Sequence, residues 1–361
     1  MAARRPPLPD RILHPAARAL WRPDSTLQLE LGDRAVIVPA DGVDAVRPVL
    51  GHHRQPAPAL SAAPPAPGSR HDVVQELTEA GYLWPADDAG VLAPSGPDGA
   101  SPRLSPPRPH LAGELRAMTV RHGEQAAELL HARRHVVVVV QGDNRAGPLV
   151  ASLLGAAGVG HVYLSDAKPV RMHQCLPGGI GPQDEGRSFG AAAAAAVQRA
   201  APQTNVRCPP AHESPDLVVL AYDEPIDPDH RAALHAHGHA HLPVRLAPDH
   251  GVVGPLVIPG LTSCLRCADL HRLDRDPAWT ALAVQLSTPP RTGSASPVTL
   301  AATLAAVAAG QALAYLDGEQ PATIDGTVEQ HLPDWRLRRR SWPVHPDCDC
   351  CRDPAFGRMG G

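Results

Sequence analysis

The sequence predicts an α/β protein with a Rossmann-like, doubly wound parallel sheet, preceded by a small α+β module. An uninterrupted β-branched run at residues 136–140 is typical of a parallel strand buried on both faces. A glycine-bearing turn and a helical segment follow it, and apolar strands then alternate with helices as far as residue 222. Before residue 111, short apolar segments are separated by stretches rich in Pro, Ala and Gly. We therefore expect the sheet in the larger, C-terminal part.

The N-terminal part predicts a winged-helix-like module over residues 1–85. Residues 26–31 alternate apolar and polar side chains, residues 34–38 are rich in β-branched residues, and Gly32-Asp33 between them favours a hairpin. Residues 41–50 and 71–80 have helical spacing. The Pro-rich residues 86–110 that follow are expected to form a linker.

The α/β part, residues 111–351, is expected to begin with a helix and to continue as strands that alternate with helices. The apolar spacing predicts these segments in order: a helix over 111–133, a strand over 135–140, a helix over 148–157, a strand over 161–165, an alanine-rich helix over 189–201 and a buried strand over 216–222. The apolar residues 297–316 predict a buried helix and not a membrane span, and residues 352–361 a polar tail.

Charge and composition narrow the function classes. The net charge of −4 gives no overall electrostatic attraction to nucleic acid, and the basic cluster at residues 336–340 is interpreted as a solvated strand end. The N-terminus has no apolar signal region, so we expect a cytoplasmic protein without membrane contact. Lys168 is the single lysine, a skew that GC-rich coding explains.

The turn after the first buried strand carries a modified dinucleotide-binding pattern. It reads Gly142-Asp143-Asn144-Arg145-Ala146-Gly147, with Asn144 where the pattern has its middle glycine. Any side chain there crowds a phosphate, and Asn tolerates that backbone conformation best. Asp166 closes the next strand, where an acidic group holds a ribose hydroxyl. Gly142, Asn144, Gly147 and Asp166 are thus candidate nucleotide-binding residues; a scaffold without nucleotide and an NAD-dependent oxidoreductase are alternatives.

Four cysteines predict a structural zinc site. Cys264 and Cys267 form one C-x-x-C pair, and Cys348 with Cys351 forms a second, with Cys350 as the alternative to Cys351. Four thiolates leave no open coordination position, so the zinc would be structural and not catalytic. The alternative is four reduced, buried cysteines without metal.

Several of these motifs resemble the ThiF/MoeB/HesA superfamily, the ubiquitin-activating-enzyme-like adenylyltransferases. The run Ala156-Ala157-Gly158-Val159-Gly160-His161-Val162-Tyr163-Leu164-Ser165-Asp166 looks like that family's AGVG-x-hydrophobic-x-D run, and the resemblance covers residues 111–351. It implies an ATP·Mg-dependent enzyme that adenylates a carboxylate. In such an enzyme Asp166 would hold the ribose, and Asp223 would be the catalytic aspartate that holds Mg²⁺.

The chain departs from the family at positions that neutralise the triphosphate. Gln174 stands at the family's Asn position, Pro177 at its Arg position and Phe189 at its Lys position, while Arg171 and Arg187 are candidate replacement cations. Phosphate charge without matching cations is strongly disfavoured in a dry site. We therefore expect a degenerate nucleotide site, with an active adenylyltransferase as the alternative.

A winged-helix-sized module ahead of such a domain resembles the actinobacterial cyclodehydratase-associated proteins of azol(in)e-peptide biosynthesis. The resemblance implies that a precursor's leader peptide adds as a strand to the hairpin, at residues 26–31 or 34–38. It also implies a cyclodehydratase-like partner enzyme and a homodimer. The expected function is binding of a leader peptide or partner enzyme in peptide modification.

Overall fold

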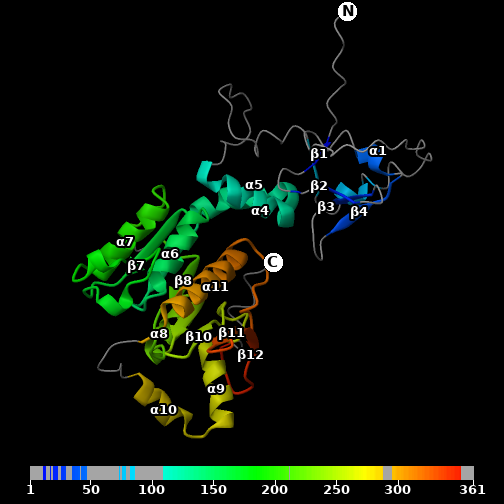
Figure 1. The fold of residues 1–361 in the computed structure, drawn as a ribbon. Helices are drawn as coiled ribbons and strands as arrows, with labels where there is room; N and C mark the ends of the chain where they lie inside the picture. Colours follow the sequence, from blue (N-terminus) through cyan, green and yellow to red (C-terminus); the bar gives the residue numbers. More distant parts are fainter. Residues whose placement is uncertain are drawn as a thin grey trace, which may run out of the picture. The chain divides into compact units, whose positions relative to one another are not determined.

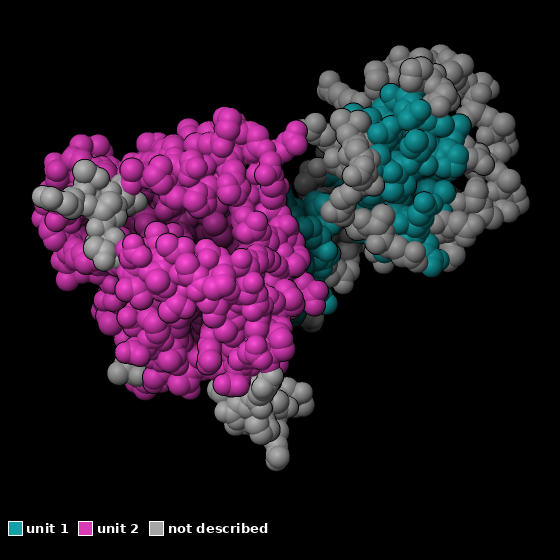
Figure 2. Space-filling model, turned by 90° about the horizontal axis from the view of Figure 1, so that it is seen from below, with its two compact units in different colours: residues 1–130 teal, residues 131–361 magenta. Residues whose placement is uncertain are grey.

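The structure is a computed structural model that divides into two compact units, residues 1–130 and 131–361 (Figure 2). It describes residues 109–210, 212–287 and 295–350, together with shorter segments within 11–46 and 73–85. The predicted linker lies largely outside the described residues, and Cys351 with the tail after it lies wholly outside them.

The first unit contains two small antiparallel sheets. Strand β1 (Arg11–Leu13) pairs with β5 (Leu83–Pro85), and β2 (Ala19–Trp21), β3 (Leu27–Leu29) and β4 (Val36–Val38) form a sheet in the order β2-β3-β4. A short helix α1 (Val43–Val46) follows, and residues 73 and 75–78 are also helical. The core of these elements is made of apolar side chains, among them Leu27, Leu29, Val38, Val46 and Leu77.

The predicted hairpin is present, because β3 and β4 pair in antiparallel register. The prediction that residues 26–31 form an exposed edge is wrong, since β2 covers the other side of β3. Local alternation does not reveal that a third strand, at Ala19–Trp21, joins the sheet. Among the described strands, β4 remains an edge strand.

The helix predicted over residues 111–133 is interrupted. After a 3₁₀ turn (Pro109–Leu111), α4 (Ala112–His122) ends at Gly123, which has φ 55°, and a second 3₁₀ turn (Gly123–Gln125) leads into α5 (Ala126–Ala132). Glycine adopts positive φ without a steric penalty, so it commonly ends a helix. Another 3₁₀ turn, Arg133–His135, precedes the main sheet.

The second unit is built around a mixed sheet of seven strands in the order β12-β11-β10-β9-β8-β6-β7. Their bounds are β6 (Val137–Gln141), β7 (His161–Ser165), β8 (Leu217–Leu220), β9 (His241–Leu246), β10 (His250–Val253), β11 (Gly326–His331) and β12 (Leu337–Ser341). Strands β7, β6, β8 and β9 are parallel, as the doubly wound sheet predicts. Strands β10, β11 and β12 extend it in antiparallel pairing.

Helices cover both faces of this sheet (Figure 1). Leu217 and Val219 of β8 point toward the core formed with α6 (Gly147–Ala156), α7 (Phe189–Ala200) and α11 (Val298–Leu316). Val218 and Leu220 point to the other face, where they pack with side chains of α8 (Pro228–Ala236) and α9 (Leu265–Arg275). Alternation along one buried strand therefore defines the two layers. Helix α10 (Trp279–Leu286) follows α9.

Helix α11 is, by length and composition, the one helix among the described residues that is long and apolar enough to cross a membrane. It contacts α6, β9 and β10, as Figure 1 shows for α6 and α11. Its buried side is made of small and branched apolar residues, namely Leu300, Ala301, Leu304, Ala305, Ala308, Ala309 and Ala312. These contacts are those of the core helix that the sequence predicts.

Candidate functional site

The candidate nucleotide site lies at the carboxyl end of β6. The connection after β6 and the connection after the neighbouring β8 lead to opposite faces of the sheet. Strand β6 lies between β7 and β8, so the connections after β6 and β8 diverge there. Ligands of doubly wound folds bind at such a point. A Cβ on Gly142 (φ 102°) would lie 2.2 Å from the carbonyl oxygen of Ala221, and one on Gly147 would lie 2.9 Å from the Cβ of Ala221. Both glycines are thus required by close packing against the end of β8.

Asn144 is buried in this turn and uses both ends of its amide. Its Nδ2 donates to Oδ1 of Asp223 (3.1 Å) and to the carbonyl of Val244 (2.8 Å). Its Oδ1 accepts from the backbone N–H groups of Ala146 (3.1 Å) and Gly147 (3.2 Å). These N–H groups at the start of α6 are the ones that would otherwise bind an anion. Within the turn, the Asn144 side chain therefore takes two N–H groups of the kind that bind an anion at a helix start.

Asp223 follows β8 and is fixed by its neighbours on β9. Its Oδ1 accepts from the N–H of Leu246 (3.1 Å) in addition to Asn144, and its carbonyl accepts from Nε of Arg245 (3.0 Å). Burial lowers the pKa of Arg245, as does the nearby charge of Arg272, while Asp223 opposes the shift. Asp223, the predicted magnesium ligand, is thus hydrogen-bonded to β9 at the carboxyl end of β8.

Asp166 and Lys168 lie beyond the end of β7. Oδ1 of the half-buried Asp166 accepts from the N–H of Lys168 (2.7 Å), and Nζ of Lys168 forms an ion pair with Asp143 (3.1 Å). Partial burial acts to lower the pKa of Lys168, but the hydrogen bond to Asp143 and nearby carboxylates raise it overall. The single lysine is therefore paired with a carboxylate of the turn.

Gln174 supports the same turn, whereas the predicted replacement arginines are engaged elsewhere or exposed. Buried Gln174 donates from Nε2 to the carbonyl of Asp143 (2.8 Å) and accepts at Oε1 from the N–H of Arg171 (2.8 Å). The Arg171 residue is exposed. Arg187 pairs with the buried carboxylate of Asp184 (2.5 Å).

Two further side chains, those of Phe189 and Arg145, bear on whether the turn offers a cation to a triphosphate. Phe189, at the family's lysine position, is fully buried in the main core at the start of α7. Arg145 donates to the carbonyls of Ser296 (2.6 Å) and Cys175 (2.5 Å), and burial lowers its pKa. The structure brings Gly142, Asn144, Gly147, Gln174 and Asp223 together around one turn. The cation of this turn is Arg145, which two carbonyls hold, while its buried Nε has no hydrogen-bond partner.

The cysteine cluster is the candidate metal centre. Cys264 caps α9 and Cys267 lies in its first turn, and the segment after β12 brings Cys348 and Cys350 to them. The Sγ atoms are 3.8 Å apart for 264–267, 3.6 Å for 264–348 and 3.4 Å for 267–350. Zn–S bonds of about 2.3 Å in a tetrahedron place sulfur atoms roughly 3.8 Å apart. The four cysteines therefore fit a metal ion, with Cys350 as the fourth member.

The pKa shifts of the cysteines in the cluster favour the binding of a metal ion. The hydrogen bond from Cys264 lowers the pKa of Cys267 to about 4, against the effect of burial, and the backbone of His345 assists. The pKa of Cys264 is raised by the same hydrogen bond and by burial. The thiolate is the metal ligand, so a site that holds a thiolate is prepared for a cation.

An aromatic and charged cluster, which the sequence analysis missed, holds the segment after β12 near this centre. Trp342 is buried and donates from Nε1 to Oγ1 of Thr327 (2.9 Å), and the guanidinium of Arg272 lies 5.0 Å from its ring centroid and 5.1 Å from that of Trp279. Nε2 of His345 lies 2.9 Å from Oδ2 of Asp274. No periodic pattern in the sequence marks these pairs.

His271, Asp274 and His345 also approach one another, but their hydrogen bonds do not fit a metal. Nδ1 of His345 accepts from the N–H of Asp347 (3.1 Å), so its Nε2 carries the proton and donates to Asp274. Nε2 of His271 donates to the carbonyl of Pro343 (2.9 Å). The group is a hydrogen-bonded anchor of the tail.

The fold and site define an α/β protein with a mixed seven-stranded sheet and a four-cysteine cluster that could hold a metal. The structure resembles Escherichia coli MccB with AMPCPP and the peptide MccA (TM-score 0.71, 14% identity, 95% of this chain and 100% of that one). It also resembles the microcin C7 biosynthetic enzyme MccB in complex with N-formylated MccA (TM-score 0.70, 13% identity, 94% and 99%). The structure of PaaA aligns with 75% of this chain and 91% of its own (TM-score 0.57, 14% identity).

No protein-family model and no curated protein matches the sequence. At these identities the likeness concerns the fold, and at that level it confirms the resemblance on which the sequence analysis relied.

Proposed function

We propose that this protein binds a peptide in a peptide-modification system, and that its nucleotide site is degenerate. The observation that carries the proposal is Asn144, whose side chain takes the anion-binding amides of α6 and a carboxylate oxygen of Asp223. Support for a peptide ligand comes from MccB, which shares the fold over 95% of this chain and whose structures contain the peptide MccA. The binding partners are then a precursor's leader peptide and a cyclodehydratase-like enzyme.

Charge around the turn supports the loss of ATP binding. A triphosphate needs several cations at close range. Lys168 is paired with Asp143, Arg187 with Asp184, and Arg145 with two carbonyls, while Phe189 lies in the core. Freeing any of these cations for phosphate would leave a carboxylate or carbonyl without its partner, and the cost is smallest for Lys168, whose side chain is 67% exposed.

The outer edge of β4 is the proposed peptide-binding strand. Among the described strands β4 pairs only with β3, so its other side is available for strand addition. Val38 is buried in the module's core while Ile37 is 51% exposed. An added strand would pair with the backbone of β4 and cover Ile37. In this proposal residues 1–85 form the recognition module and residues 111–351 the ThiF-like domain.

The proposed metal is zinc, held by Cys264, Cys267, Cys348 and Cys350. The sulfur spacing and the all-thiolate donor set support it. A site closed by four thiolates has no position for substrate, so the zinc would tether the tail and take no part in chemistry.

Calorimetric titration with ATP·Mg and a pyrophosphate-exchange assay test the degenerate site. We expect neither measurable binding at millimolar ATP nor exchange. Micromolar binding together with exchange would overturn the proposal and favour an active adenylyltransferase. The position of Asp166 and Asp223 around the turn supports that second function. It predicts that Asp223→Ala abolishes exchange, and unchanged exchange in this variant would contradict it.

Binding of a labelled precursor peptide tests the strand-addition site. Ile37→Asp should weaken binding at least about tenfold, because it places a charge where apolar surface is covered. The matched control is Leu337→Asp, which changes a similarly exposed side chain (52%) on the edge strand β12 of the other sheet. Equal affinity of both variants would contradict peptide binding at β4.

A further inference from the structure

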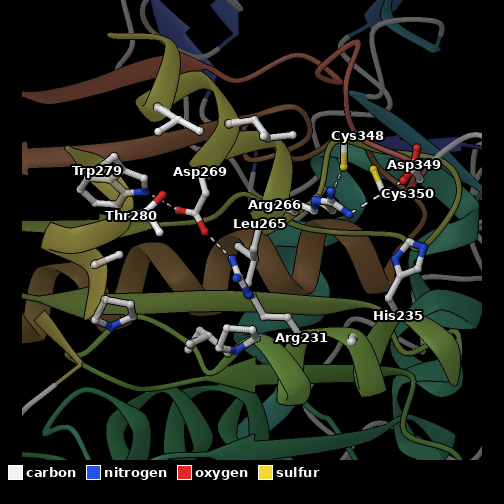
Figure 3. A pocket seen from close by; sticks show the side chains of 18 of the residues that line it. Arg231, His235, Leu265, Arg266, Asp269, Trp279, Thr280, Cys348, Asp349 and Cys350 are labelled. Atoms are coloured by element: carbon white, nitrogen blue, oxygen red, sulfur yellow. Dashed lines mark hydrogen bonds and ion pairs between the residues drawn. The ribbon is translucent and has the colours of Figure 1, made fainter. Parts of the chain in front are cut away.

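The cysteine cluster lies at one end of a cavity of about 840 Å³ between α8, α9 and α10 (Figure 3). Three of its four members, Cys264, Cys348 and Cys350, contribute to the lining. Figure 3 shows Arg266 and Asp349 beside Cys348 and Cys350. Both of these charged residues line the cavity and are exposed to solvent. A small molecule in the solvent can therefore reach sulfur atoms of the cluster through the cavity.

The members of the cluster differ in how far they are buried. Cys264, Cys267 and Cys348 are buried, whereas Cys350 is half-buried. The susceptibility of a cysteine to oxidation follows its thiolate character and its exposure. Cys350 is thus the member that an oxidant in the cavity meets most readily. Sγ of Cys267 lies 3.4 Å from Sγ of Cys350, so a second sulfur is at hand to complete a disulfide.

The distances between the sulfur atoms favour disulfides that join the two segments of the cluster. The Sγ atoms lie 3.4 Å apart for 267–350 and 3.6 Å apart for 264–348, against 3.8 Å for 264–267. An S–S bond is about 2.05 Å long, so side-chain rotation has to close each of the two shorter gaps by roughly 1.5 Å. Both of these pairs connect α9 with the segment after β12.

The pairing that stays within each segment fits less well. It joins Cys264 with Cys267, the most widely separated of the three pairs above, and leaves Cys348 to pair with Cys350. Only Asp349 lies between those two cysteines, and so small a ring restricts the dihedral angle that a disulfide requires.

We propose that the cysteine cluster is a peroxide-sensitive site, at which the disulfides Cys264–Cys348 and Cys267–Cys350 form and the bound zinc is released. One thiolate of a pair attacks an oxygen of hydrogen peroxide; an S–O bond forms as the O–O bond breaks, and the departing hydroxide takes up a proton. The second thiolate attacks the oxidised sulfur, and the S–S bond forms as hydroxide leaves that sulfur and takes up another proton. Each disulfide therefore consumes one peroxide and two protons, transfers two electrons from sulfur to oxygen and yields two molecules of water.

The two disulfides replace one tether of the segment after β12 by another. Oxidised sulfur no longer holds the cation, because the thiolate is the metal ligand. The new bonds nevertheless join residues that are 84 and 83 positions apart in the chain. A covalent link across so many residues lowers the entropy of the unfolded chain and thereby stabilises the folded one. The inference rests on the zinc proposed above, but it is independent of peptide binding at β4.

Hydrogen peroxide treatment of the full-length, zinc-loaded protein, followed by alkylation, proteolysis and mass spectrometry, tests the pairing. Trypsin cleaves after Arg266 and endoproteinase Asp-N cleaves before Asp349, so each member of the cluster falls in a separate peptide. Cys351→Ser protein keeps a second cysteine out of the Cys350 peptide. We expect release of one zinc per chain, measured with a metal indicator, and two linked peptide pairs, 264–348 and 267–350. Dithiothreitol should cleave both links and restore zinc binding.

Cys175 and Cys208, which lie outside the cluster, are the internal controls and should be alkylated and unlinked. Retention of zinc without linked peptides, any other linkage within the cluster, or sulfinic acid in place of the disulfides would overturn the proposal. The zinc content before treatment tests the proposed zinc, and the linked peptides test the pairing of the sulfur atoms, so the two failures give different results.

Thermal denaturation tests whether the tether survives the loss of the metal. The oxidised, metal-free protein should melt at least about 5 °C higher than reduced protein from which EDTA has removed the zinc, because only the oxidised chain keeps α9 covalently joined to the segment after β12. Equal melting temperatures of the two metal-free forms would contradict the exchange of one tether for another.

Discussion

A single side chain, Asn144, links the three elements that form the candidate site. Its four hydrogen bonds join the start of α6, the end of β8 and the middle of β9. The sequence predicts that Asn at this position crowds a phosphate. It does not predict that the Asn144 amide binds the N–H groups of α6 and also reaches β8 and β9, because Asp223 and Val244 come near it only in the folded sheet.

We predict that Asn144→Ala lowers the free energy of unfolding by about 2–4 kcal/mol, since it leaves buried donors and acceptors without partners. Urea denaturation followed by circular dichroism measures the change. Asn205→Ala is the control, because Asn205 is exposed and its Oδ1 accepts only a local N–H, that of Arg207. A loss for Asn144→Ala no larger than that of the control would show that Asn144 does not hold these elements together.

The second prediction at the residue scale concerns the pH dependence of stability at His241. Its pKa falls from an ordinary value of 6.5 to about 4 on folding, mainly because burial disfavours the imidazolium. The unfolded chain therefore binds a proton between about pH 6.5 and pH 4 that the folded chain does not, and stability is lost as the pH falls through this range.

The loss expected from His241 is at most about 3 kcal/mol, the free energy of this pKa difference. Denaturation midpoints measured from pH 7 to pH 4.5 should fall less steeply for His241→Gln than for the unchanged protein. His212→Gln, at an exposed position, should retain the full slope. Identical slopes for all three proteins would contradict the assigned pKa shift.

At the scale of elements, the apolar pattern within a segment predicts whether that segment forms a strand or a helix. The β-branched run gives β6, the alternating residues give the hairpin of β3 and β4, and apolar spacing gives α6, α7 and α11. The antiparallel strands β10 and β11 are not among the predicted elements, and β12, which reads LRRRS with every residue exposed, is expected only as a solvated strand end. Its pairing with β11 is set by partners and not by its own apolar pattern.

Gly310 in α11 and Gly142 in the turn after β6 differ in the space around their Cα atoms, and this difference gives a third prediction. Gly310 lies in the middle of α11, is exposed, and a Cβ there would meet nothing within 4 Å. Gly310→Ala should raise the free energy of unfolding by about 0.5–1 kcal/mol, since alanine is the better helix former. Thermal denaturation measures the shift.

Gly142→Ala is the contrasting substitution in the turn after β6. The added Cβ would lie 2.2 Å from the carbonyl oxygen of Ala221, at a φ of 102°. It should lower stability by about 2 kcal/mol or more. If Gly142→Ala were tolerated as well as Gly310→Ala, close packing of the turn against β8 would not explain why glycine occupies this position.

For the molecule as a whole, the second unit is closed by contacts between α9 and the segment after β12. Both cysteine pairs, the stacking of Arg272 on Trp342, and the hydrogen bond between His345 and Asp274 join these two segments. The sequence predicts the cysteines because their chemistry is legible from spacing alone. The remaining contacts are single side-chain pairs between segments remote in the chain, which spacing does not reveal.

A metal bound by these cysteines would stabilise the whole fold, since an ion that binds only the folded chain adds RT ln(1 + [L]/Kd) to its stability. We predict one zinc per chain, measured by atomic absorption after purification without added metal. Cys348→Ser should lose the zinc and lower the melting temperature, and Cys175→Ser, at a half-buried cysteine outside the cluster, should retain it. Absence of zinc in the unchanged protein would leave four reduced cysteines as the explanation.

The identity of the fourth ligand is decided by a pair of adjacent substitutions. The spacing of the second pair allows Cys350 or Cys351, and the sequence analysis put Cys351 first because it completes a C-x-x-C pattern. In the structure Sγ of Cys350 lies 3.4 Å from that of Cys267, within the four-sulfur cluster, while Cys351 lies outside the described residues. We therefore expect Cys350→Ser to reduce zinc content and melting temperature as much as Cys348→Ser does. Cys351→Ser should leave both unchanged, and the reverse result would assign the ligand to Cys351.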